Sequence, residues 1–375
     1  MPSKEQILEH CQRLHAYLVR RHYSRGLLHG PDPGVRFNWR LWRFAKSALD
    51  FIPWGDDYIF MQTQGNWVLA NWVLFDATGS ARYREIALES SEATLALQKP
   101  AGYWPYPLPE RRHLIAALES IWGATALLVT YSREKRPELL QAAVRAYDFI
   151  LKKIGFQKHD PGEAINYFDK PRGKVPNNSV IAAWFFLRLW RASGDGRFLE
   201  HVAPLLNFIA AVQLPSGEIP YIVDSPLERG REHYLCFQYN AHQFVHLCRS
   251  EMLRPGAGAK PILTRLWNFL RRGVQPNGSC ANDCASVDGR GPEVNYYTAA
   301  LGSALHYAHR LGVDPSDDAA QRCFARVLER QRTDGSYGFS TRNYGVLRDG
   351  RSYPRYQAMT LFHLLSVLDH EAFLD

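Results

Sequence analysis

The sequence lacks the short motifs that mark nucleotide-dependent enzymes, serine hydrolases and zinc proteases. No G-x-G-x-x-G, P-loop, G-x-S-x-G or H-E-x-x-H pattern occurs in its 375 residues. No apolar stretch reaches 18 uncharged residues, and no basic segment followed by an apolar one opens the chain. These absences disfavour nucleotide-driven chemistry, give no reason to expect a cofactor, and predict a cytoplasmic protein without a transmembrane segment.

The charge balance is basic but not concentrated. Lys and Arg number 45 against 37 Asp and Glu, which gives a net charge of +8. A basic surface can attract nucleic acid, anionic lipid or an acidic polysaccharide. There is no Lys-rich run, Arg-rich helix or zinc-finger spacing, so a nucleic-acid partner is not expected.

Cysteine is scarce, with six residues in the chain. Several of them lie on apolar helical patterns, where a reduced buried thiol is the usual case. Cys280 and Cys284 form a C-x3-C pattern that is compatible with half of a metal site. No second pair of Cys or His stands at matching spacing, so the sequence predicts no metal.

What the chain does contain is a repeat. Five segments that end a helical pattern carry a Gln followed within a few residues by a Gly. The Gln residues are 59, 56, 62 and 56 positions apart, and they are Gln98, Gln157, Gln213, Gln275 and Gln331. A fixed period of this size indicates a repeat architecture in which each unit buries its apolar face against its neighbours.

Two sets of helices alternate along this repeat. The set ending at Gln has polar faces and is expected at about 4–22, 81–98, 136–155, 197–213, 260–275 and 317–331. The other set is more apolar and is expected at about 58–77, 112–131, 178–193, 236–253, 294–311 and 356–368. Six outer and six inner helices predict an all-α fold, an (α/α)6 barrel occupying residues 1–375 as a single domain. An open helical solenoid is the alternative.

The loops of this barrel are very unequal in length. Those leading from outer to inner helices are long and rich in Trp, Tyr, Asn, Asp and Arg, and they span about 23–57, 99–111, 157–177, 214–235, 276–293 and 332–355. Long ordered loops are usually functional. They all reach the N-terminal ends of the inner helices, where helix dipoles favour negative charge, so we expect the binding site on that face.

Five residues are candidates for proton transfer. Asp56 and Asp57 form a carboxylate pair beside Trp54, although either could instead cap the first inner helix. Glu119 lies on a largely apolar inner helix, where a carboxylate needs an ion-pair partner or a catalytic role. Tyr239 and His242 begin another inner helix and suit proton transfer, although His242 could equally be a hydrogen-bonded core residue.

Further loop and first-turn residues are candidates for substrate binding. Arg111, Arg342 and Arg355 could hold a carboxylate through paired hydrogen bonds, which favours an acidic sugar. The full set is Trp54, Gln64, Trp104, Tyr106, Arg111, Asn166, Tyr167, Asp169, Asn178, Tyr221, Gln238, Asn240, Asn295, Tyr296, Tyr337, Arg342 and Arg355.

Two groups of helical toroids resemble this chain. The Gln-to-Gly punctuation resembles the QW-type repeats of terpene cyclases and prenyltransferases. Some of these cyclases carry an Asp-x-Asp-Asp acid, for which this chain has only Asp56-Asp57 and Asp317-Asp318. The helix-pair layout and the turn at 193–199 are similar to unsaturated glucuronyl hydrolases, polysaccharide lyases and sugar epimerases.

The expected function is therefore a carbohydrate-active enzyme that acts on an acidic, uronate-type saccharide by acid–base chemistry. Hydrolysis requires two carboxylates across the bond, whereas elimination or epimerisation requires a base near a carbon beside a neutralised carboxylate. A terpene cyclase-like enzyme with an aromatic cavity and a non-catalytic glycan-binding toroid are the alternatives.

Overall fold

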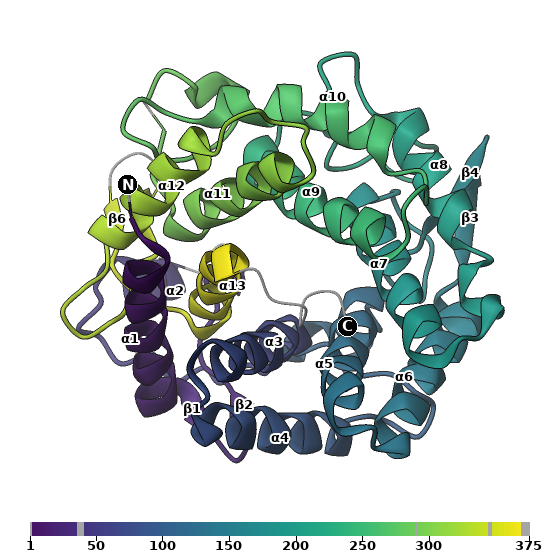
Figure 1. Ribbon diagram of the computed structural model, residues 1–375, viewed down its shortest axis with the longest axis horizontal. Coiled ribbons are helices and arrows are strands. Elements are labelled where there is room, and N and C mark those ends of the chain that lie inside the picture. Colours follow the sequence, from purple (N-terminus) through teal and green to yellow (C-terminus); the bar gives the residue numbers. More distant parts are fainter. Residues whose placement is uncertain (1, 36–40, 290, 344–346, 369–375) are drawn as a thin grey trace.

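The computed structural model describes residues 2–35, 41–289, 291–343 and 347–368. Twelve of the helices in these residues form two concentric layers (Figure 1). The inner layer comprises α3 (Met61–Thr78), α5 (Ala117–Glu134), α7 (Pro176–Ser193), α9 (Cys236–Leu253), α11 (Asn295–Arg310) and α13 (Pro354–Leu365). The outer layer comprises α1 (Lys4–His22), α4 (Ala81–Ala96), α6 (Pro137–Phe149), α8 (Val202–Val212), α10 (Lys260–Leu270) and α12 (Asp318–Glu329).

The inner ring is closed. Each inner helix packs against the next along the chain, and α13 packs back against α3. In the outer ring, α1 lies beside α12, so the first and last outer helices also meet. The predicted (α/α)6 barrel is confirmed, and the open solenoid is wrong, because a solenoid would leave α3 and α13 apart.

The inner helices are buried on nearly every side, which explains their continuous apolar sequence. In α7 every residue from Asn178 through Leu189 is buried. A helix that is apolar all round finds partners only in a protein interior. Burial of a side chain such as Phe185 contributes about 1.5–3 kcal/mol, so this layer supplies much of the stability of the fold.

Three of the five repeated Gln residues connect one outer helix to another. Nε2 of Gln98, just after α4, donates to the carbonyls of Gly102 in its own turn and of Ala142 in α6, at 3.1 and 2.8 Å. Nε2 of Gln213 donates to the carbonyls of Gly217 and of Ile262 in α10, at 2.8 and 3.1 Å. At these positions the repeat is a joint between successive outer helices, whereas the side chains of Gln157 and Gln275 donate to Asn166 and Ser286 of their own loops.

The Gly of each joint is required by close backbone approach. Gly217 has φ +91°, and a Cβ there would lie 2.1 Å from the carbonyl oxygen of Arg265. Gly102 has φ +103°, and its Cβ would lie 2.3 Å from the carbonyl oxygen of Arg145. Only glycine fits a left-handed turn pressed against another backbone.

The long loops contain regular structure that the sequence pattern did not predict. They include helix α2 (Leu41–Ala48) and three antiparallel hairpins, β1–β2 (Tyr23–Ser24, Leu27–Leu28), β3–β4 (Phe156–His159, Gly162–Ile165) and β5–β6 (Ser340–Asn343, Leu347–Asp349). The hairpins are too short for a hydrophobic period to reveal them. Within the described residues, none of the helices combines the length and apolarity needed to cross a membrane.

Candidate functional site

A small cavity lies on the barrel axis, and all six inner helices line it near their N-terminal ends. Its volume is about 90 Å³, which is space for roughly six water molecules. It is lined by Gln62, Leu118, Tyr167, Val175, Asn177, Ile181, Tyr221, Gln238, Tyr239, His242, Tyr296, Arg355, Tyr356 and Met359. The lining comprises five tyrosines, three amides, one histidine and one arginine against four aliphatic side chains.

The tyrosines form two packed groups around this cavity. The rings of Tyr221 and Tyr239 have centroids 4.7 Å apart, and those of Tyr296 and Tyr356 have centroids 4.6 Å apart. Burial, together with the neighbouring tyrosines, raises the pKa of Tyr239 well above its ordinary value. Tyr239 is therefore a neutral phenol at neutral pH and can donate a hydrogen bond or a proton.

His242 lies in the same cavity, one helical turn after Gln238. Its exposed fraction is 4%, and neither ring nitrogen has a hydrogen-bond partner among the described residues. Burial and the nearby Arg249 lower the pKa of His242 to about 3. The imidazole is consequently neutral, with a nitrogen lone pair available. The described residues do not supply the hydrogen bond that the interpretation of His242 as a hydrogen-bonded core histidine expects.

Arg355 places a fixed positive charge at the cavity. Its Nε donates to Oε1 of Gln62 at 3.0 Å, and an Nη lies 3.4 Å from Oδ2 of the buried Asp32. The guanidinium also lies over the ring of Phe60, 4.5 Å from its centroid. A cation oriented from three sides is suited to hold an anionic group in one position.

Glu119 lies close behind this cavity without lining it. Its Oε2 accepts a hydrogen bond of 2.7 Å from the backbone N–H of Met61, at the start of α3. Burial raises the pKa of Glu119 to about 7, although the Met61 N–H and Arg355 favour its ionised form. Glu119 thus satisfies the first N–H of a neighbouring inner helix, a role that the sequence did not suggest.

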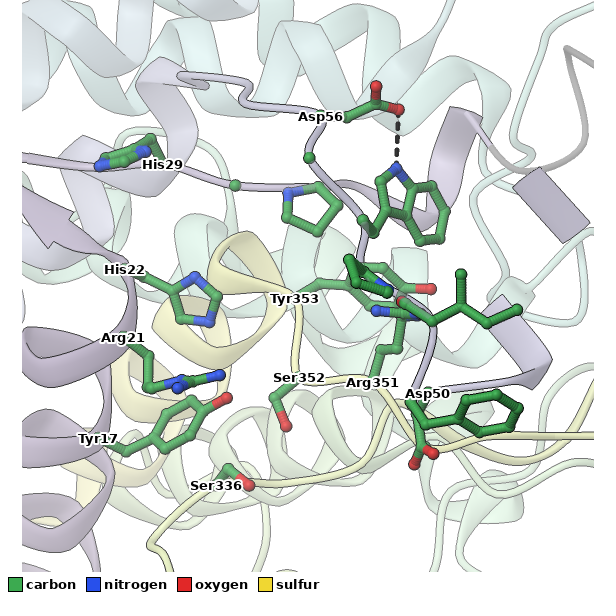
Figure 2. Close-up of a pocket in the computed structure, with 18 of the residues that line it drawn as sticks. Tyr17, Arg21, His22, His29, Asp50, Asp56, Ser336, Arg351, Ser352 and Tyr353 are labelled. Atoms are coloured by element: carbon green, nitrogen blue, oxygen red, sulfur yellow. Dashed lines mark hydrogen bonds between the residues drawn. The ribbon is translucent and has the colours of Figure 1, made fainter. Parts of the chain in front are cut away.

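Asp56 and Asp57 lie in a different and larger pocket, of about 740 Å³. Figure 2 shows Tyr17, Arg21 and His22 of α1 on one side of it and Asp56, Arg351 and Tyr353 on another.

Hydrogen bonds in this pocket engage both carboxylates. Nε1 of Trp54 donates to Oδ2 of Asp56 at 2.7 Å, and Asp57 pairs with His29. Neither carboxylate caps the first inner helix, because α3 begins at Met61 after Phe60 with no side-chain cap. The capping interpretation is wrong.

Four of the predicted ligand contacts instead bind the protein backbone. The side-chain amide of Gln64 pairs with both the N–H and the carbonyl of Leu28, and that of Asn240 pairs in the same way with Ile219. Asn166 donates to the carbonyl of Ile154, and Asn295 donates to that of Gly338. These amides fasten the long loops to the barrel.

The other predicted contacts lie away from the cavity. Trp104 is fully buried, and its Nε1 donates to the carbonyl of Thr94. Asp169 accepts a hydrogen bond from the N–H of Ile115, and Tyr106 packs on Phe168. Asn178 and Tyr337 are buried outside the cavity lining, Arg111 is exposed, and the side chain of Arg342 lies outside the described residues.

The structure brings together Tyr167, Tyr221, Gln238, Tyr239, His242, Tyr296 and Arg355 from the predicted set. Seven lining residues were missed, namely Gln62, Leu118, Val175, Asn177, Ile181, Tyr356 and Met359. The position of a residue within its helix could have identified some of them. The second residue of five inner helices faces the cavity, and these residues are Gln62, Leu118, Asn177, Tyr296 and Arg355.

The architecture of this chain is similar to that of proteins with solved structures. No protein-family description matches the chain, and no curated protein is similar to it in sequence. The cellobiose 2-epimerase of Bacillus thermoamylovorans B4167 superposes with a TM-score of 0.73 at 12% identity, over 97% of this chain and 99% of that one. The fold is that of carbohydrate-active (α/α)6 enzymes.

Two further structures agree with this assignment. A glycosyl hydrolase family 88 protein from Bacteroides vulgatus has a TM-score of 0.66 at 11% identity, over 98% of this chain and 99% of that one. A polysaccharide lyase has a TM-score of 0.66 at 11% identity, over 98% of each chain. At this identity the likeness establishes the fold alone.

Proposed function

We propose that this protein is a carbohydrate-active enzyme that moves a proton at a carbon of an acidic saccharide, as a lyase or an epimerase. The observation that carries this proposal is the meeting of Tyr239, His242 and Arg355 in one axial cavity. Among the described residues that line the cavity there is no carboxylate. A neutral base, a neutral acid and a fixed cation are the groups that proton transfer beside a carboxylate requires.

Hydrolysis is less well supported. It uses two carboxyl groups about 5–10 Å apart on either side of the scissile bond. Glu119 lies behind the cavity and is engaged by the N–H of Met61, while Asp56 and Asp57 line the other pocket. The described residues therefore offer no carboxylate pair at the axis.

Each residue takes a distinct role in the proposed reaction. Arg355 binds the uronate carboxylate and thereby stabilises the negative charge that develops when the adjacent carbon loses its proton. His242 accepts that proton, and the anionic ligand raises its pKa because a nearby negative charge favours the imidazolium form. Tyr239 donates a proton.

The two reactions differ in where the electron pair of the broken C–H bond goes. In elimination it forms a C=C bond as the glycosidic C–O bond breaks, and the leaving oxygen takes the proton of Tyr239. In epimerisation it takes a proton back on the opposite face of the same carbon, with Tyr239 as the donor. Both reactions leave the number of hydrogens and electrons balanced without a cofactor.

Two features of the cavity support a saccharide over an apolar polyene. Ten of the fourteen lining side chains carry a hydrogen-bonding group, and the other four are aliphatic. Tyrosine rings such as those of Tyr221 and Tyr239 are available for stacking on a sugar ring. The net charge of +8 also favours an anionic substrate over a neutral one.

The test is to incubate the protein with uronate-containing oligosaccharides in deuterated water and follow products by mass spectrometry and NMR. We expect either an unsaturated uronate, or deuterium at the carbon beside the carboxylate with inverted configuration. The proposal fails if reducing ends are released without either change, which identifies a hydrolase. It fails equally if saccharides bind unchanged, which identifies a binding toroid.

A further inference from the structure

Three potential metal-binding side chains meet where the fourth and fifth long loops approach helix α9, and a fourth, Cys236, contacts one of them. Oε2 of Glu218 lies 2.6 Å from Nδ1 of His233, and that Nδ1 lies 3.8 Å from Sγ of Cys284. The candidate ligand atoms of these three residues all lie within 4.8 Å of one another. Sγ of Cys236, the first residue of α9, lies 3.4 Å from Sγ of Cys284.

Two of these separations, sulfur to sulfur and sulfur to nitrogen, are close to those of a tetrahedral site. With metal–sulfur bonds of about 2.3 Å and metal–nitrogen bonds of about 2.0–2.1 Å, two sulfurs lie about 3.8 Å apart and sulfur and nitrogen about 3.6 Å apart. The observed values are 3.4 and 3.8 Å. Glu218 and His233 are at hydrogen-bonding distance, so a cation bound here would replace the proton between them.

The donor set selects the kind of ion. Two thiols and an imidazole are soft or borderline ligands, which favour Zn²⁺ over Mg²⁺ or Ca²⁺. Glu218, His233 and Cys284 converge on one point, and the thiol of Cys236, which contacts Cys284, is the candidate for the fourth position of a closed site of structural type. The side chain of His233 is 57% exposed, so an ion can reach the site from solvent.

We propose that Glu218, His233, Cys236 and Cys284 bind one zinc-like divalent cation that fastens the loop at 214–235 to the loop at 276–293. The sequence did not reveal this site, because Cys284 is partnered by Cys236 rather than by Cys280. The thiol of Cys280 is buried and points to the carbonyl of Ala281, at 3.2 Å.

The proposed site supports one wall of the axial cavity. The chain between Glu218 and Cys236 carries Tyr221 and Tyr234, whose ring centroids lie 5.0 Å apart. Tyr221 packs in turn on Tyr239, three residues after Cys236 in α9. A cation joining the two ends of this segment would therefore fix the tyrosine wall.

Metal binding can be measured without any assay of enzymatic activity, so it tests this proposal independently. The full-length protein, purified under reducing conditions and freed of metal, is titrated with Co²⁺, whose thiolate and tetrahedral absorption bands report the ligand set. We expect one Co²⁺ per chain, displaced by Zn²⁺, and release of thiol protons on binding. Zn²⁺ should raise the melting temperature of the metal-free protein.

Three variants and one control locate the ligands. Cys284→Ser and Cys236→Ser should each lower the thiolate band by about half, and His233→Ala, at an exposed position, should weaken Co²⁺ affinity about tenfold or more. Cys280→Ala should keep the spectrum and the affinity, and circular dichroism confirms that each variant is folded.

Three results would overturn the metal site. They are the absence of a Co²⁺ spectrum in the wild-type protein, an unchanged spectrum in Cys284→Ser, and a disulfide between Cys236 and Cys284 after anaerobic purification with reductant. Failure of the proton-transfer assay leaves all of these measurements unaffected, so the two proposals are judged separately.

Discussion

Nε2 of Gln331 donates a hydrogen bond of 2.9 Å to the backbone carbonyl of His10, 321 residues away in the chain. His10 lies in α1 and Gln331 follows α12, so this contact joins the last outer helix to the first. The same nitrogen donates to the carbonyl of Gly335 in its own turn. The joint that connects successive outer helices therefore also closes the ring.

Replacing Gln331 by methionine should destabilise the protein by roughly 1–2 kcal/mol, because two carbonyls lose a donor while the side-chain volume is kept. Urea denaturation measures the change. Gln141→Met, on the exposed face of α6, is the matched control and should be close to neutral. Equal stabilities of the two variants would show that the closing contact contributes nothing.

Alanine variants of two glycines distinguish the cost of backbone strain from the cost of a steric clash. Gly194 has φ +73° with nothing within 4 Å of an added Cβ, so Gly194→Ala should cost about 1–2 kcal/mol from strain alone. Gly335 has φ +91°, and its Cβ would lie 2.4 Å from the carbonyl oxygen of Arg13. Gly335→Ala should therefore cost about 2–5 kcal/mol in the same unfolding assay. A smaller loss than in Gly194→Ala would contradict the close approach.

The buried Glu119 predicts a pH dependence of stability. Its pKa rises from 4.5 to about 7 on folding, so its contribution is complete below pH 4.5 and is lost as the pH rises towards 7. Relative to Glu119→Gln, the wild-type protein should lose about 3 kcal/mol across this window. Parallel stability profiles of the two proteins would exclude this assignment, and the exposed Glu9→Gln variant controls for the change of charge.

Removal of the Tyr239 hydroxyl tests the proposed acid. Tyr239→Phe should lower the rate of elimination or exchange by about 10²–10⁴, the range typical of a lost proton-transfer group, with little change in saccharide affinity. Tyr103→Phe removes a hydroxyl from a half-buried tyrosine that packs on Phe149 outside the cavity, and it should retain activity. A similar loss in both variants would remove Tyr239 from the mechanism.

Two roles of Arg355 can be tested separately. One is its ion pair with Asp32, which stabilises the fold, and the other is the binding of an anionic ligand. Arg355→Gln should destabilise the protein by about 1–3 kcal/mol, because Asp32 stays buried without its partner. The double variant Asp32→Asn with Arg355→Gln should regain part of this stability. Neither variant should bind a uronate saccharide, as calorimetry would measure. Uronate binding by the double variant would show that Arg355 is not the anchor.

The inner and outer helices could be predicted because their hydrophobic periods are long and repeated. Their first residues were less certain. The second inner helix was expected from 112 but α5 begins at Ala117, since Ala116 pairs as an isolated bridge with Phe168 of another loop. That pairing depends on a segment 52 positions away, which a local pattern does not contain.

The site was predicted in part for the same reason. Tyr239, His242 and Arg355 were found because they begin inner helices, whose N-terminal ends all point to one face. Asn240 and Gln64 begin inner helices too, yet a rotation of about 100° per residue turns them to the loops rather than the cavity. Local sequence places a residue in the first turn, but it does not state which side of that turn faces the axis.

The sequence alone determined the repeat, the alternation of two helix types and the face that carries the long loops, because these depend on periodicity along the chain. Only the tertiary structure decided which of the predicted polar residues line the axial cavity and which line the larger pocket. It separated Asp56 and Asp57 from Tyr239 and brought Cys236 to Cys284. The physical reason is that closing the ring sets distances between residues of different repeats, and those distances are properties of helix packing rather than of spacing in the sequence.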